Sequence, residues 1–196
     1  VEAATQAGAD ALGFVFWPGS PRFVTAARAA AIAATLPPLV ATVGVFVDQP
    51  VDDIRHVAAE VGLSAVQLHG DEPAASWRVV PGFCLKAVNA GAGFDAASVA
   101  SWPHGVYPLV DAADPVRRGG TGRLADWSAA AAIARLRPTI LAGGLDAENV
   151  GDAITRVRPH AVDVSSGVER SPGIKDANRL RAFVDAVAAA DAARKP

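Results

Sequence analysis

The feature that most constrains the fold is a regular alternation along the chain. Short apolar runs, rich in β-branched or aromatic residues and bounded by Gly, Pro or Asp, alternate with longer Ala-rich stretches of helical character. This alternation predicts an α/β fold with a parallel sheet. The expected strands are residues 11–16, 42–47, 65–68, 84–88, 106–110, 139–142 and 161–164. The expected helices are residues 25–36, 51–61, 72–80, 94–100, 127–136, 147–157 and 177–190, with a solvated tail at 191–196.

Length and composition predict one domain over residues 1–196, because a chain that is 51% hydrophobic can bury one substantial core. The net charge of -2, with scattered Arg and Lys, predicts no nucleic-acid or anionic-membrane surface, although a local site can still bind a small anion. No apolar stretch is long enough for a membrane helix, so we expect a cytoplasmic protein. The single cysteine, Cys84, excludes an internal disulfide and has no partner spacing for a metal.

Two segments predict a phosphate site: Leu-Ala-Gly-Gly-Leu at 141–145 and Val-Asp-Val-Ser-Ser-Gly-Val-Glu at 162–169. Glycine lets backbone N–H groups approach an anion closely, and a following helix N-terminus adds a favourable dipole. The alternative is two ordinary strand-to-helix turns. We predict that the phosphate is bound mainly by the N–H groups of Gly143, Gly144, Ser165, Ser166 and Gly167.

In an eight-fold β/α barrel, the loops after strands seven and eight often bind phosphate, so the pattern predicts a (β/α)8 TIM barrel. Only seven strands are apparent. Residues 1–7 have the pattern of the back half of a helix that ends at Gly8, and a helix in this position should follow a strand. We therefore expect about a dozen or more residues, one strand and half a helix, to precede Val1. An open seven-stranded sheet is the alternative.

The chain resembles the phosphoribosylanthranilate isomerase family from end to end. The matching segments are residues 8–16, 20–22, 43–47, 66–70, 109–111, 119–122, 126–127, 141–145 and 162–169. The resemblance implies an Amadori rearrangement of N-(5-phosphoribosyl)anthranilate in tryptophan biosynthesis. It implies a phosphorylated small molecule as the binding partner, a monomer or a homodimer, and neither a cofactor nor a metal.

This reaction needs an acid that protonates the ribose ring oxygen and a base that removes the C2′ proton. Asp111, at the end of an expected strand, matches the acid of the family; a turn-capping Asp is the alternative. The resemblance assigns the base to a cysteine at the end of a first strand. Cys84 opens a strand instead, where residues usually serve stability, so we assign the base to no residue of this chain.

Four residues are expected to bind the rest of the substrate. Arg22 matches the family arginine and can fork onto the anthranilate carboxylate, unless it is a solvated surface arginine. Gln67 and His69 alternate onto one side of their strand and line the site, and Asp163 binds sugar hydroxyls. Lys86, in the middle of a strand, is expected to form an internal ion pair.

The Gly-rich run 119–122 suits a lid over the substrate or a simple flexible connection. Two other functions stay open. One is another phosphate-binding barrel enzyme, such as indole-glycerol-phosphate synthase, which needs a lysine acid at a strand mouth, or a ribulose-phosphate epimerase, which needs metal-binding histidines. The other is a barrel that binds a phosphorylated ligand without turnover.

Overall fold

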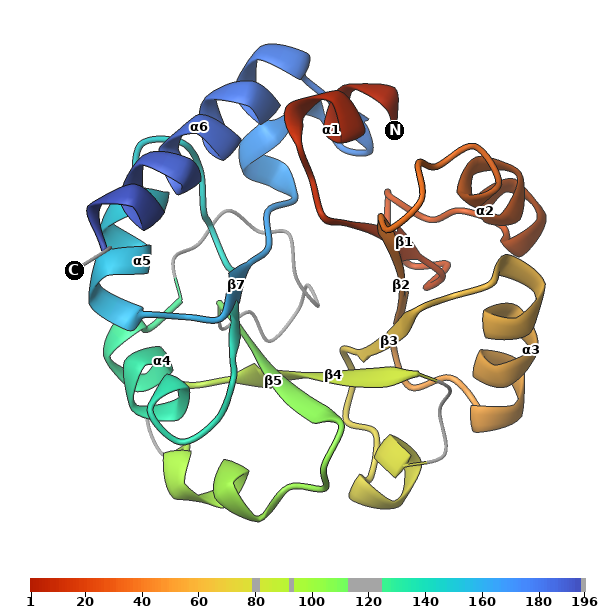
Figure 1. Ribbon diagram of the computed structural model, residues 1–196. Helices are drawn as coiled ribbons and strands as arrows, with labels where there is room; N and C mark the ends of the chain where they lie inside the picture. Colours follow the sequence, from red (N-terminus) through yellow and green to blue (C-terminus); the bar gives the residue numbers. More distant parts are fainter. Residues whose placement is uncertain (79–81, 92–93, 113–124, 195–196) are drawn as a thin grey trace. The chain divides into compact units, whose positions relative to one another are not determined.

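The computed structural model describes residues 1–78, 82–91, 94–112 and 125–194 (Figure 1). Their contacts group the chain into two compact units. The first unit is Val1–Ala87 with Pro103–Val106, and the second is Val88–Trp102 with Tyr107–Pro196. Each unit is described by itself, and a single domain over the whole chain stays a prediction.

The first unit is a parallel sheet in the order β1-β2-β3-β4. The register pairs Gly13 with Val43, Val43 with Ala65, and Ala65 with Phe83. Helices α2 and α3 lie side by side against the sheet (Figure 1). The elements, with the last two residues of β4 in the second unit, are α1 (Glu2–Ala7), β1 (Ala11–Val15), α2 (Ala26–Ala33), β2 (Ala41–Phe46), α3 (Val51–Val61), β3 (Ala65–Leu68), the 3-10 helix η1 (Ala74–Arg78) and β4 (Phe83–Asn89).

Local sequence signals set the helix ends of this unit. The Thr25 side chain accepts a hydrogen bond from the backbone N–H of Arg28 at 3.3 Å and so caps α2, as predicted. Gly8 and Gly62 end α1 and α3 in the left-handed conformation, with φ of 96° and 72°. Each helix therefore stops where the chain must turn into the next strand.

The second unit contains the parallel strands β5-β6-β7, in which Val110 pairs with Leu141 and Leu141 with Val162. Helix α5 packs between α4 and α6 (Figure 1). An antiparallel ribbon, β8 with β9, precedes α6. The elements, with the first residue of β5 in the first unit, are η2 (Ala96–Ser101), β5 (Val106–Asp111), α4 (Trp127–Ala134), β6 (Ile140–Leu141), α5 (Val150–Val157), β7 (Ala161–Val162), η3 (Ser166–Val168), β8 (Glu169–Ser171), β9 (Ile174–Lys175) and α6 (Ala177–Ala193).

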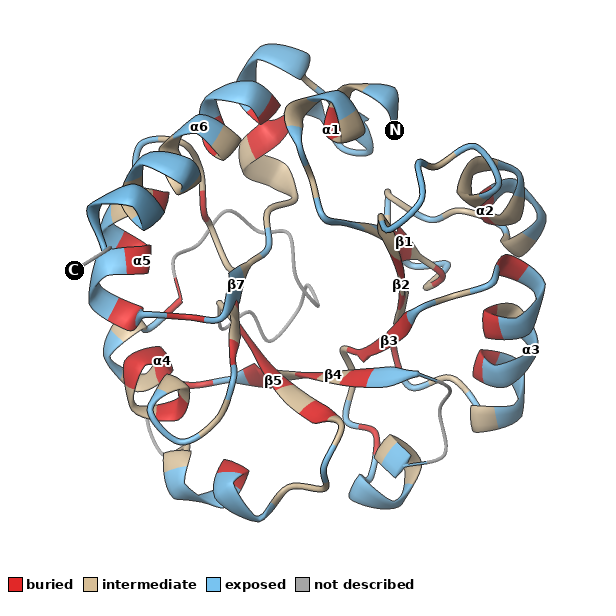
Figure 2. Ribbon diagram, viewed as in Figure 1, coloured by how far each residue is buried: buried red, intermediate tan, exposed pale blue. Residues whose placement is uncertain are grey.

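Each unit has its own apolar core, formed by strand residues and one face of each helix (Figure 2). In the first unit the Phe16 and Phe46 rings stack with centroids 5.2 Å apart above Ile54 and Leu68, which are fully buried. In the second unit the largest fully buried side chains are Leu109, Ile133, Leu141, Leu145 and Val150. None of the helices in the described ranges has the length and apolar character that a membrane crossing requires.

All seven predicted parallel strands are confirmed, with ends that differ by one or two residues. The α-helices expected at 72–80 and 94–100 are wrong, because these segments form the short 3-10 helices η1 and η2. Both are too short to repay the cost of an α-helical nucleus. Helix α5 begins at Val150 and not at 147, because Asp146 caps a turn by accepting from the N–H groups of Glu148 and Asn149. The tail prediction is wrong in part, since α6 continues to Ala193.

Candidate active site

Asp111 is the last residue of β5, so its side chain stands at the carboxyl end of a parallel strand, where barrel enzymes place their catalytic groups. It is half-buried, and the three residues before it are buried. Its Oδ1 atom accepts a hydrogen bond from the backbone N–H of Ala112 at 2.7 Å. The carboxylate is therefore held at the strand end by the first peptide of the loop that follows.

The loop after β6 packs directly against Asp111. Gly143 has a φ of 80°, and a Cβ atom at this position would lie 2.6 Å from the backbone nitrogen of Ala112 and 3.0 Å from Oδ1 of Asp111. Only glycine allows both the positive φ and this close approach. The predicted acid and the first half of the predicted phosphate site are thus neighbours.

The loop after β7 packs in turn against the loop after β6. A Cβ atom on Gly167 would clash with the carbonyl group of Leu145 and would lie 3.2 Å from Cα of Asp146. The second loop is fixed from its other side by Lys175 of β9, whose Nζ donates to the carbonyl oxygen of Ser165 at 2.9 Å and lies 3.2 Å from the buried Glu169 carboxylate. The second unit therefore brings both Gly-containing loops together, as the sequence predicts.

Several backbone N–H groups in these loops have no acceptor. Within the described part of the chain, the N–H groups of Gly143, Gly144 and Ser165 make no hydrogen bond. Ser166 and Gly167 begin η3, and the first N–H groups of a helix have no partner within it. Clustered N–H groups of this kind form a site for an anion.

Asp163 follows β7 directly, one residue beyond the strand, and is exposed. The expected strand 161–164 is therefore too long by two residues. The Asp163 backbone N–H donates to the carbonyl oxygen of Leu141 at 2.8 Å, which fixes it beside β6. The loop after β6 is further fixed by Asn149, whose Nδ2 donates to the carbonyl oxygen of Gly144 at 3.0 Å.

The first unit holds the other three predicted residues. Gln67 is buried on β3, and its Nε2 atom lies 2.7 Å from Nδ1 of the half-buried His69, so the two side chains share one face as predicted. Arg22 lies in the turn after β1, where its backbone N–H donates to Oγ of Ser20 at 3.1 Å. A bridge between Val15 and Phe23 returns this turn to the end of β1.

Lys86 forms the internal ion pair that the sequence predicts, and the partner is Glu72. Its Nζ lies 2.7 Å from Oε2 of Glu72 and also donates to the carbonyl oxygen of Gly70; both charged side chains are more than nine-tenths buried. Burial alone would raise the pKa of the Glu72 carboxyl. The hydrogen bond and charge of Lys86, with a hydrogen bond from the backbone N–H of Asp48, outweigh burial and hold the pKa below its usual value.

The sequence predicts the pair but not the partner. Asp71 and Glu72 follow β3 together, and no pattern distinguishes the exposed Asp71 from the buried Glu72. The Glu72 carboxylate accepts from the backbone N–H groups of Gly70 at 2.9 Å and Asp48 at 3.0 Å. The pair therefore ties the loop after β3, which starts at His69, to the end of β2.

Cys84 is excluded as the missing base. It is the second residue of β4, it pairs with Val66, and it is 2% exposed. Burial raises the pKa of its thiol to about 12, so the thiolate is not formed near neutral pH. The predicted lid at 119–122 lies outside the described residues. Among the described residues no three His, Cys, Asp or Glu side chains cluster as a metal site.

A cavity of about 430 Å³ lies at the opposite edge of the second unit. It is lined by the residues that precede β6 and β7 and by Arg194 at the end of α6. None of the predicted site residues lines it. The cavity is therefore not the candidate active site, which the loops at the carboxyl ends of β5, β6 and β7 form.

Comparisons with known proteins are reported with this geometry in place. The model of the family described as N-(5'phosphoribosyl)anthranilate (PRA) isomerase matches residues 1–186. An N-(5'-phosphoribosyl)anthranilate isomerase of Chromohalobacter salexigens is 47% identical over 188 residues, which cover 95% of this chain and 88% of that protein. Such a match extends over both units.

Solved structures agree. Phosphoribosyl anthranilate isomerase from Thermotoga maritima is 39% identical with a TM-score of 0.87, and covers 96% of this chain and 92% of its own. A phosphoribosyl anthranilate isomerase in complex with reduced 1-(o-carboxyphenylamino)-1-deoxyribulose 5-phosphate is 38% identical with a TM-score of 0.84 and the same coverage. The fold is therefore that of the (β/α)8 barrels.

Proposed function

This chain belongs to the N-(5'-phosphoribosyl)anthranilate isomerase family and is an isomerase, and from that premise we propose how its residues act on their substrate. The reaction is the rearrangement of N-(5'-phosphoribosyl)anthranilate to 1-(2-carboxyphenylamino)-1-deoxyribulose 5-phosphate, a step of tryptophan biosynthesis. The observation that carries the assignment is the contact between Asp111 and Gly143. It supports one site with a carboxyl group next to a cluster of N–H donors.

The loops after β6 and β7 bind the substrate phosphate. The N–H groups of Gly143, Gly144 and Ser165 are without acceptors among the described residues, and they lie on two loops in direct contact. N–H groups that are already unpaired lose no internal hydrogen bond when an anion binds. The first N–H groups of η3, from Ser166 and Gly167, complete the proposed donor set.

Asp111 protonates the ribose ring oxygen when the ring opens. Its position at the end of β5, next to the phosphate-binding loop, supports this role, since a general acid must reach the reacting oxygen while the phosphate is bound. The half-buried environment removes part of the water that would otherwise favour the ionised form. We assign the base that removes the C2′ proton to no residue of this chain.

The remaining substrate contacts are proposed within single units. In the first unit, Arg22 forks onto the anthranilate carboxylate, and the hydrogen-bonded pair of Gln67 and His69 contacts the substrate without transferring a proton. In the second unit, the exposed Asp163 accepts hydrogen bonds from sugar hydroxyls. These roles follow the family resemblance and the strand-end positions of the residues.

The test compares turnover of N-(5'-phosphoribosyl)anthranilate by the protein and by Asp111→Asn. The amide has the shape of the carboxyl group but cannot donate its proton, so we expect turnover to fall by about two to four orders of magnitude. Asp185→Asn is the matched control, because Asp185 is exposed on α6. Substrate consumption over time is the measurement.

Binding of reduced 1-(o-carboxyphenylamino)-1-deoxyribulose 5-phosphate, measured by calorimetry, separates chemistry from recognition. We expect Asp111→Asn to retain binding while it loses turnover. Binding by the unmodified protein without any turnover would contradict the isomerase assignment and favour a binding-only barrel. Turnover that Asp111→Asn leaves unchanged would remove Asp111 from its role as the acid.

A further inference from the structure

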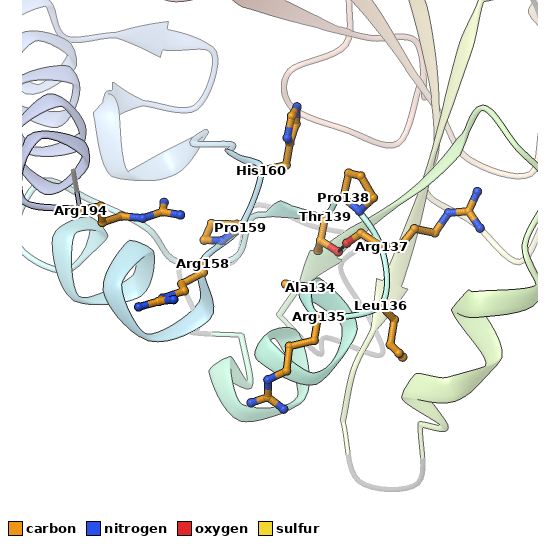
Figure 3. Close-up of a pocket in the computed structure, with 10 residues that line it drawn as sticks. All are labelled: Ala134, Arg135, Leu136, Arg137, Pro138, Thr139, Arg158, Pro159, His160 and Arg194. Carbon is orange, nitrogen blue, oxygen red and sulfur yellow. Dashed lines mark hydrogen bonds between the residues drawn. The ribbon is translucent and has the colours of Figure 1, made fainter. Parts of the chain in front are cut away.

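The cavity of about 430 Å³ in the second unit is strongly basic. The chain runs from the end of α4 into β6 along one wall and from the end of α5 into β7 along another (Figure 3). Ten residues line the cavity; four are arginines, one is a histidine and none is acidic. The chain as a whole carries a net charge of -2, so this local excess of positive charge opposes the balance of the molecule.

Two of the arginines are available to a ligand. Arg137 is committed, since its Nη1 donates to the carbonyl oxygens of Val99 at 3.2 Å and Trp102 at 2.8 Å. Arg194 lies 3.6 Å from the Asp191 carboxylate. The guanidinium groups of Arg135 and Arg158, by contrast, make no hydrogen bond or ion pair with any residue in the described ranges.

Arg135 and Arg158 also line a second cavity of about 220 Å³, between α4 and α5. They are the C-cap residues of these two packed helices, so they stand at neighbouring helix ends where the two cavities adjoin. The guanidinium of Arg156, on the second cavity, is placed over the Trp127 ring at 5.1 Å. An anion at the shared wall would meet two unpaired guanidinium groups.

The backbone of Arg158 adds an independent observation. Arg158 ends α5 in the left-handed conformation with a φ of 54°, a position that glycine occupies after α1 and α3. A helix C-terminus favours a basic residue, which accounts for the charge, but not for a strained conformation that glycine would avoid. Strain of this kind points to a function of the side chain.

We propose that this cavity, between the ends of α4 and α5, is a second anion site that binds a small polyanion with phosphate groups of the diphosphate type. Arg135 and Arg158 would each donate two hydrogen bonds to phosphate oxygens, because the planar guanidinium matches that geometry. The cavity volume lies in the range of small-molecule sites. The site is separate from the strand-end loops and does not rest on the proposed isomerase reaction.

The test is calorimetric titration of the protein with inorganic diphosphate at fixed ionic strength. We expect Arg135→Gln with Arg158→Gln to weaken the dissociation constant at least tenfold. Arg181→Gln is the matched control; it removes the same charge from an exposed position on α6, about 20 Å along the helix from Arg194. Unchanged affinity in the double variant, or no binding to the unmodified protein, would overturn the proposal.

Arg158→Gly separates a ligand role from a structural one. Glycine relieves the left-handed strain, so we expect a higher melting temperature together with weaker diphosphate binding. A higher melting temperature with unchanged diphosphate affinity would overturn the proposal. Amide chemical shifts locate the ligand: changes at Leu136 and Thr139 support the second site, and changes confined to Gly143, Gly144 and Ser165 place diphosphate at the strand-end loops and refute it.

Discussion

At the scale of single residues, glycines set the distances between the strand-end loops of the second unit. Gly143 lets the loop after β6 approach Asp111, and Gly167 lets the loop after β7 approach Leu145. A side chain at either position would push one loop away from its neighbour. The proposed phosphate site therefore depends on what these two residues lack.

Gly143→Ala should damage both stability and substrate binding. The positive φ costs an alanine about 1–2 kcal/mol, and its Cβ would press on the Ala112 nitrogen. We expect a lower free energy of unfolding and a higher KM for the phosphorylated substrate. Gly151→Ala is the matched control, because Gly151 lies in α5 with open space around it and should gain about 0.5–1 kcal/mol. Urea unfolding and steady-state kinetics measure both; equal effects of the two variants would contradict this view.

Glu72→Gln should reduce stability at neutral pH and lose its effect in acid. Removing one partner of a buried ion pair costs about 3–5 kcal/mol. Because the pKa of Glu72 is lowered by folding, its contribution is present above the ordinary pKa of 4.5 and is lost as the pH falls through the lower pKa of the folded state. The two unfolding free energies should therefore converge below pH 4.5. Glu148→Gln, at an exposed carboxylate, should follow the unmodified protein throughout; a gap for Glu72→Gln that is constant with pH would contradict the prediction.

At the scale of elements, side-chain caps fix where the helices begin. Asp126 caps α4, since its Oδ1 accepts from the backbone N–H groups of Ser128 at 2.9 Å and Ala129 at 3.1 Å. The helix spans only eight residues, so its first turn is a large share of its length. The cap is therefore important for a helix that contributes the buried Ile133 to the core.

Asp126→Ala should lower the free energy of unfolding by about 1 kcal/mol, because two N–H groups of the first turn lose their acceptor. Asp126→Asn keeps an acceptor oxygen at the same place and should restore most of the stability. Thermal and urea unfolding of the three proteins decide the point. An asparagine variant as unstable as the alanine variant would show that the charge, and not the hydrogen bond, is the important property.

The elements also explain how far the sequence could predict this molecule. Buried parallel strands are predictable because their apolar runs are bounded by Gly, Pro or Asp, and all seven are found. The ribbon of β8 and β9 was missed, because Glu169–Ser171 and Ile174–Lys175 have no apolar alternation. Its signal was the Pro-Gly pair at 172–173, in which Gly173 has the φ of 82° that a type II turn needs.

Site residues divide in the same way. Gly143 and Gly144 could be predicted, because a backbone site needs glycine and glycine is visible in a sequence. The partner of Lys86 could not, since Glu72 acts through a long-range contact between a loop and a strand. The basic cavity could not be predicted either, because Arg135 and Arg158 are 23 positions apart and meet only where α4 and α5 pack.

At the scale of the whole molecule, the two edges of the strands have different tasks within the second unit. The carboxyl edge carries Asp111 and the Gly-containing loops. The amino edge carries Arg137, which connects the segment before β6 to the carbonyl groups of η2 and the residue that follows it. Barrel enzymes in general place catalysis at the first edge and stability at the second.

This division predicts opposite outcomes for two substitutions. Arg137→Gln should lower the free energy of unfolding by about 1–3 kcal/mol, because two charge-assisted hydrogen bonds are lost, while kcat/KM stays within about twofold. Asp111→Asn should reduce kcat and leave the melting temperature close to that of the unmodified protein. Chemical unfolding and kinetics on the same samples test the pair, and a large loss of turnover in Arg137→Gln at full folding would contradict the division.

The burial of Cys84 has a practical consequence. It is the only thiol in the sequence, and it lies inside the first unit. A thiol reagent added to the folded protein therefore reacts only with molecules in which this strand has opened, so the labelling rate measures that opening without any engineered probe. The protein thus contains its own reporter of local unfolding, and each variant above can be ranked by one labelling experiment under native conditions.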